Sequence, residues 1–82
     1  MIVLDGRHMT DRGELHAELK RKLSLPEYYG NNLDALNDCL SERRERELVV
    51  IQSAGAFLEG CEGYGLKLLQ LFGDNGIQVL LD

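Results

Sequence analysis

The sequence has no run of apolar residues long enough to cross a membrane. Its longest runs, such as residues 48–51, are short, whereas a membrane-spanning helix needs about 20 apolar residues in succession. No basic segment followed by an apolar stretch stands behind Met1, so nothing in the sequence indicates secretion. We therefore expect a cytoplasmic protein that does not associate with membranes.

Cysteine and histidine are scarce, with two of each in the chain. Cys39 and Cys61 form no CxxC motif and have no histidine at zinc-ligand spacing, so we expect two reduced thiols, with a structural disulfide as the alternative. For His8 and His16 we expect surface or half-buried positions, because neither has the nucleophile or carboxylate beside it that a catalytic histidine needs. The sequence thus predicts no catalytic residue, no metal and no cofactor, and a protein that is not an enzyme.

Basic residues are missing from one segment of the chain. Residues 26–42 contain Glu27, Asp34, Asp38 and Glu42 but no lysine or arginine, and they hold most of the net charge of −5. Such a concentrated negative field repels nucleic-acid phosphates and attracts cationic surfaces. A basic protein is therefore the expected partner, and direct nucleic-acid binding is not expected.

Three apolar runs, at residues 2–4, 48–51 and 77–81, predict strands. Because these runs are nearly continuous, they indicate strands covered on both faces, as in a parallel sheet. Helical patterns between the runs supply the crossovers that parallel strands need. The prediction is an α/β fold with a small three-stranded parallel sheet flanked by helices, forming a single domain over residues 1–82.

Helix boundaries are marked by capping residues. Asp11 and Glu14 have capping-box spacing and precede Leu15, Leu19 and Leu23, which recur every four residues on one helical face. Three further segments are expected to follow: a helix over 33–42 capped by Asn32, a short turn or helix capped by Ser53, and a helix over 66–72. The glycines around the start of the last helix are interpreted as loop and helix punctuation and not as a phosphate-binding motif: Gly60, Gly63 and Gly65.

The helix expected over 33–42 carries Asp34, Asp38 and Glu42 one turn apart, so their carboxylates form a single acidic stripe. In the loop before it, Tyr28 and Tyr29 are adjacent and can hardly both point inward. An exposed tyrosine beside carboxylates is a common composition of protein-binding hot spots. The alternatives are a solvated polar face and a divalent-metal site on the stripe.

Residues 25–40 read LPEYYGNNLDALNDCL and closely resemble the signature of the barstar family, the intracellular inhibitors of guanyl-preferring bacterial ribonucleases. The rest of the chain agrees with that family in the order of its elements. The resemblance implies the family fold, a three-stranded parallel sheet with flanking helices. It also implies a monomer that forms a one-to-one complex with a basic, extracellular-type ribonuclease and plugs its active site.

The resemblance implies a partner-binding role for nine residues: Tyr28, Tyr29, Gly30, Asn32, Asp34, Asn37, Asp38, Glu42 and Asp74. Asp38 matches the carboxylate that takes the place of the substrate phosphate. Asn37 stands where the family's best-known member has tryptophan, and Glu42 where a small residue is expected. These departures concern the choice of target, and a barstar-like interaction or toxin-immunity module with another partner is the alternative.

Overall fold

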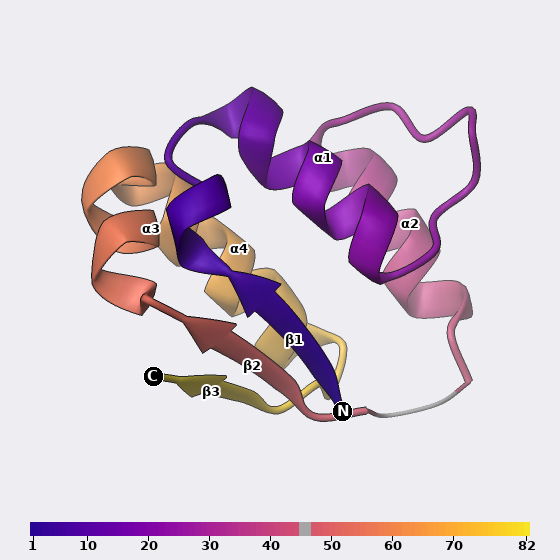
Figure 1. Cartoon of the computed structure of the whole chain (residues 1–82). Coiled ribbons are helices and arrows are strands. Elements are labelled where there is room, and N and C mark those ends of the chain that lie inside the picture. The colour runs from indigo at the N-terminus through magenta and orange to yellow at the C-terminus, as the bar shows by residue number, and fades with distance from the viewer. Residues whose placement is uncertain (45–46) are drawn as a thin grey trace.

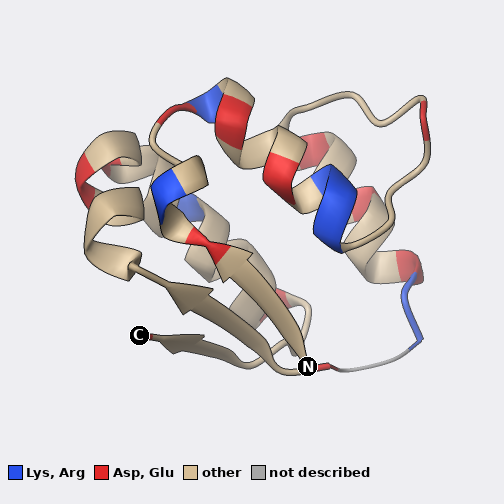
Figure 2. Cartoon of the chain, in the orientation of Figure 1, with Lys and Arg blue, Asp and Glu red and all other residues tan. Residues whose placement is uncertain are grey.

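The computed structural model describes residues 1–44 and 47–82, which form a three-stranded parallel sheet with helices packed against it (Figure 1). The strands are β1 (Ile2–Asp5), β2 (Val49–Gln52) and β3 (Val79–Leu81), in the order β1-β2-β3. Figure 2 shows that the strands carry no charge apart from the acidic residue that ends β1. The predicted α/β fold is confirmed, although β3 begins two residues later than the apolar run at 77–81.

Helices occupy both crossovers. A short 3-10 helix, η1 (Gly6–His8), follows β1, and α1 (Arg12–Lys22) and α2 (Leu33–Glu42) then lead to β2. Between β2 and β3 lie α3 (Ala54–Cys61) and α4 (Gly63–Asp74). None of these helices, within the described part of the chain, has the length and apolar content needed to span a bilayer.

The start of α1 confirms the predicted cap. Asp11 Oδ1 accepts the backbone N–H of Glu14 at 2.8 Å, which satisfies one of the free donors of the first turn. In a capping box the Glu14 carboxylate would accept the backbone N–H of the cap residue, Asp11. Here it accepts instead from the preceding residue, Thr10, from the hydroxyl at 2.7 Å and from the N–H at 3.3 Å. The expected leucine stripe is buried.

The prediction that both faces of the sheet are covered is wrong. On one face Leu4, Val49 and Ile51 are fully buried, whereas the row formed by Val3, Val50 and Leu80 on the other face is only partly covered, and Leu80 is 56% exposed. The strand order explains this. Because the chain moves from β1 to β2 to β3 in one direction, crossovers of the same hand deliver all helices to the same face.

The core lies between that face and the helices. Its fully buried side chains come from nearly every element, and the largest apolar ones are Leu4, Met9, Leu15, Leu19, Leu36, Leu40, Ile51, Phe57, Leu68 and Phe72. Burial of apolar side chains is the main stabilising contribution in a domain of this size. The acidic stripe of α2 therefore faces away from the core, since Leu36 and Leu40 turn inward.

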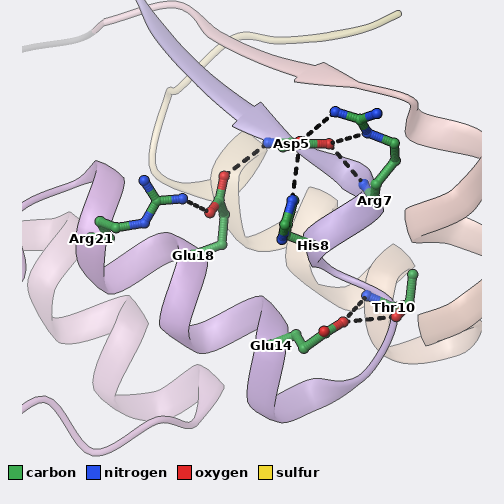
Figure 3. Close-up of polar contacts among 7 residues, drawn as sticks. All are labelled: Asp5, Arg7, His8, Thr10, Glu14, Glu18 and Arg21. Carbon is green, nitrogen blue, oxygen red and sulfur yellow. Dashed lines mark hydrogen bonds and ion pairs between the residues drawn. The ribbon is translucent and has the colours of Figure 1, made fainter.

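A buried carboxylate closes the outer edge of β1. Glu18, which is 3% exposed, accepts the backbone N–H of Asp5 at 2.9 Å and pairs through its other oxygen with Arg21 (Figure 3). Asp5 also accepts from the Arg7 side chain at 3.0 Å, and this hydrogen bonding lowers the pKa of Asp5 to about 2. The contacts of Glu18 with Asp5 and Arg21 satisfy a carboxylate whose burial would otherwise be costly, and the contact with Asp5 joins α1 to β1.

Two expectations about the second crossover are wrong, the loop role of its glycines and the cap at Ser53. Gly60 lies within α3, and Gly63 and Gly65 lie within α4, so they are helical rather than loop residues. At Gly60 a Cβ atom would stand 2.6 Å from the carbonyl oxygen of Thr10, so glycine is needed for close packing, which the spacing of glycines alone does not reveal. Ser53 precedes α3 but has φ 53° and makes no capping hydrogen bond with its side chain.

The break between α3 and α4 falls on Glu62, which has φ 49° and ψ −128°. Glycine tolerates this conformation far better than a residue with a Cβ atom. We expect Glu62→Gly to raise the free energy of unfolding by about 1 kcal/mol. Glu59→Gly, at an exposed position inside α3, is the matched control and should lower it by about the same amount. Thermal or urea unfolding measures both, and a destabilised Glu62→Gly variant would contradict the prediction.

Candidate functional site

The first turn of α2 is fixed by an asparagine that uses both polar ends of its side chain. Asn32 Oδ1 accepts the N–H of Ala35 at 2.7 Å, which confirms the predicted cap. Its Nδ2 donates to the carbonyl oxygen of Gly30 at 3.2 Å. The loop over residues 24–32, called here the binding loop, is therefore joined to the start of α2 through the side chain of Asn32.

The carboxylates of Asp34, Asp38 and Glu42 follow one another along the exposed face of α2. Figure 2 shows acidic bands recurring along this helix, with basic residues only after its end. Within the described residues, none of the three carboxylates forms an ion pair, whereas Asp5, Glu18 and others elsewhere are paired. Asp34 gains from the N-terminal end of the helix dipole, but Asp38 and Glu42 lie beyond the first turn. The stripe is therefore unneutralised negative charge facing solvent.

The two adjacent tyrosines of the binding loop point in opposite directions. Tyr28 is 88% exposed, whereas Tyr29 is 6% exposed and its hydroxyl lies 2.7 Å from Nδ1 of His16. Burial raises the pKa of Tyr29. The expectation that both cannot point inward is confirmed, and only a small part of Tyr29 is left for contact with a partner.

His16 is the residue of this region whose role the sequence did not indicate. It is 1% exposed, so the expectation of a surface or half-buried position is wrong. Its Nε2 lies 2.5 Å from the hydroxyl of Tyr64 in α4, and the guanidinium of Arg12 stacks 4.3 Å from the centre of the Tyr64 ring. One imidazole thus joins α1, the binding loop and α4.

A hollow separates the binding loop from α2. It is lined on the side of the loop by residues within 24–30, Tyr28 and Tyr29 among them, and on the side of α2 and its end by Ala35, Asp38, Cys39, Glu42 and Arg43. Burial and the nearby carboxylates of Glu42 and Asp38 raise the pKa of the Cys39 thiol, in that order of effect. A concave surface with an aromatic wall and two carboxylates fits a cationic group, such as a guanidinium or an imidazolium.

The far end of α4 reaches the middle of α2. Asn75 Nδ2 donates to Oδ1 of Asn37 at 3.0 Å and to the carbonyl oxygen of Leu71 at 2.9 Å. Asn37 is therefore held by α4 even though its side chain is exposed. Asp74, the exposed last residue of α4, precedes this contact directly and is the most peripheral of the predicted site residues.

The structure also bears on the metal and disulfide alternatives. Over residues 1–44 and 47–82, no group of three histidine, cysteine, aspartate or glutamate side chains is arranged to hold a metal ion. Cys39 and Cys61 are both free thiols, and Cys61 Sγ donates to the carbonyl oxygen of Met9 at 3.0 Å. The disulfide alternative is therefore wrong.

Comparison with known proteins gives two findings. The sequence model of the family described as barstar (barnase inhibitor) matches residues 1–79, almost the whole chain. A Bacillus subtilis (strain 168) protein named "Putative ribonuclease inhibitor YrdF" is 55% identical over 40 residues, which cover 49% of this chain and 44% of that protein. The matched region thus spans less than half the length of that relative.

The two tyrosines give a matched pair of substitutions. We expect Tyr29→Phe to lower the free energy of unfolding by about 1–3 kcal/mol, because it leaves one nitrogen of the buried His16 ring without a partner. Tyr28→Phe, next to it but exposed, should change stability by less than about 0.5 kcal/mol. Urea unfolding of both variants checks this, and equal effects would contradict the inward orientation of Tyr29.

Proposed function

Because the chain belongs to the barstar family, we propose that it inhibits a ribonuclease by covering the enzyme's active site with α2 and the binding loop. The observation that carries this proposal is the row of carboxylates on α2, which have no ion pair with any described residue, beside the exposed Tyr28. A ribonuclease must gather cationic side chains around the phosphate that it cleaves. A surface of fixed negative charge is complementary to such a site.

Asp38 is the central residue of the proposed contact. It lies in the middle of the exposed face of α2 and on the wall of the hollow, so a cation that enters the hollow meets its carboxylate. A carboxylate can replace a phosphate as the acceptor of charge-assisted hydrogen bonds from arginine. Because α2 is capped at Asn32 and packed on the core, little ordering is required on binding.

The binding loop supplies the second part of the contact. Tyr28 offers an exposed ring that can stack on a cationic or imidazole side chain of the enzyme, with Tyr29 behind it on the wall of the hollow. Gly30 and Asn32 follow at the exposed start of α2. The proposed target is a basic, extracellular-type, guanyl-preferring ribonuclease, bound one-to-one in the cytoplasm.

The target need not be the one that other barstar-family members bind. Asn37 presents an amide that is held by Asn75, where a large apolar contact would otherwise be available. Glu42 adds a carboxylate to the hollow. Both features favour a partner surface that is more polar and more cationic, and an immunity or interaction module with such a partner is the second candidate function.

Inhibition assays test the central carboxylate. We expect the protein to inhibit cleavage of RNA by purified guanyl-preferring bacterial ribonucleases stoichiometrically, and Asp38→Ala to weaken binding by at least about 2 kcal/mol, the range of interface hot spots. Glu59→Ala removes an exposed carboxylate on α3 and is the matched control, expected to leave binding unchanged. Equal inhibition by the Asp38→Ala variant would contradict the proposed mechanism. Binding without inhibition would favour the second candidate function.

Ionic strength tests the electrostatic contribution. We expect the association rate constant to fall as salt is raised from about 0.01 to 0.15 M, where the Debye length shortens from about 30 to 8 Å, while the dissociation rate changes less. The double variant Asp34→Asn, Glu42→Gln should have a smaller salt dependence because it carries two fewer charges on the stripe. Stopped-flow binding measures both, and association that is independent of salt would indicate an apolar interface.

A further inference from the structure

The contacts of His16 depend on the protonation state of its ring. A neutral imidazole has one N–H donor and one acceptor nitrogen, so one of the two tyrosine hydroxyls accepts from His16 and the other donates to it. Both ring nitrogens are then satisfied at 1% exposure. In the protonated ring both nitrogens donate, so the hydroxyl that had donated loses its acceptor. Within the described residues, neither Tyr29 nor Tyr64 has another hydrogen-bond partner for its hydroxyl.

The groups around the two tyrosines do not compensate a positive charge on the ring. Arg12, from α1 itself, stacks on Tyr64 and carries the same sign as a protonated His16. Cys39 of α2 lies near Tyr29 and Cys61 of α3 near Tyr64, and both thiols have raised pKa values and are therefore neutral. Among the described residues no carboxylate forms a hydrogen bond or an ion pair with His16.

Charged groups further out do not change this balance. Beyond Tyr64 an open hollow is lined by two cations, Arg12 and Lys67, and by one carboxylate, Asp34. On the other side of the binding loop, Lys20 of α1 lies 3.5 Å from the carboxylate of Glu27. That pair is at the surface and is weak, so it does not hold the loop in place by itself.

We propose that His16 is a positioning residue that holds the binding loop against α1 and α4 only while its ring is neutral, so that acid releases the loop. The effect on the target rests on the proposed function, because the released loop carries Tyr28 and Gly30. The release of the loop itself is a property of the protein alone. Tyr64 takes part through the second hydrogen bond, although it lies far from the binding loop in sequence.

The direction of the effect follows from linkage. Burial lowers the pKa of His16 from its ordinary value of 6.5, so the released or unfolded chain takes up the proton more readily than the closed form. The closed form has its full stability above pH 6.5 and loses it progressively as the pH falls below that value. At pH 5 the protonated form of a histidine with a pKa of 6.5 is about thirty times as abundant as the neutral form. The population of the released form therefore rises by up to about thirtyfold relative to neutral pH.

Amide hydrogen exchange of the intact protein measures the release. The N–H of Tyr29, bonded to the carbonyl oxygen of Pro26 at 2.9 Å, reports on the binding loop. The N–H of Val49, bonded to the carbonyl oxygen of Gln78 at 2.9 Å, reports on the sheet. We expect the protection of Tyr29, corrected for intrinsic exchange rates, to fall by up to about thirtyfold between pH 7.5 and pH 5, starting near pH 6.5 where the released chain begins to take up the proton. Protection of Val49 should change much less.

Three variants assign the effect to His16. His16→Gln keeps a hydrogen-bonding side chain that does not titrate, and it should abolish the pH dependence at Tyr29. His8→Gln is the matched control at the other, exposed histidine and should retain it. Tyr64→Phe keeps the ring beneath Arg12 and removes the hydroxyl, so it should lower the protection of Tyr29 already at pH 7.5 by taking away the second hydrogen bond of the His16 ring.

Several results would overturn the proposal. The first is a His16 ring that titrates while the protection of the Tyr29 N–H stays constant. The second is an equal loss of protection at the Tyr29 and Val49 amides as the pH falls. The third is a His8→Gln variant in which the protection of Tyr29 no longer depends on pH. If His16→Gln fails to fold, the titration of the unmodified protein still decides. Inhibition at pH 7.5 tests the proposed function separately. If the protein inhibits a ribonuclease but the protection of its binding loop does not depend on pH, only the acid release is overturned. If acid releases the loop but the protein inhibits no ribonuclease, only the proposed function is overturned.

Discussion

The placement of the proposed site depends on the two hydrogen bonds of the buried His16 ring. Apolar burial holds the helices against the sheet, but it is not directional and does not by itself set the orientation of a loop. Hydrogen bonds have narrow limits of distance and angle. With Tyr29 drawn inward to His16, the neighbouring Tyr28 is turned outward, and the loop lies where it forms one wall of the hollow beside α2.

Features of the fold that depend on neighbouring residues could be predicted from the sequence. The caps at Asp11 and Asn32, the leucine stripe of α1 and the three strands follow from local patterns, and the structure confirms them. Coverage of the sheet could not be predicted in the same way, because an apolar run looks alike whether one or both faces are covered. What decides coverage is the order of the strands, which is a property of the whole chain.

The proposed site shows the same division. The stripe on α2 and the opposed tyrosines follow from helical spacing and adjacency. The contact between Asn37 and Asn75, and that between His16 and Tyr64, join residues far apart in sequence, and no local pattern announces them. For His16 one signal was available: it precedes Leu19 by three residues and so lies at the border of the apolar stripe. A polar residue at such a border is buried only when partners are available, and those partners come from other elements.

The two outer edges of the sheet differ. At β1 the Glu18 carboxylate occupies the N–H of Asp5, whereas β3 ends the strand order on the other side with Leu80 and Leu81 exposed. An added strand would have to displace Glu18 at β1, and it would take from that buried carboxylate the backbone N–H that it accepts. A further strand is therefore accommodated more readily beside β3 than beside β1. Strands added beside β3 would extend the sheet on the side opposite β1, away from α1 and the binding loop.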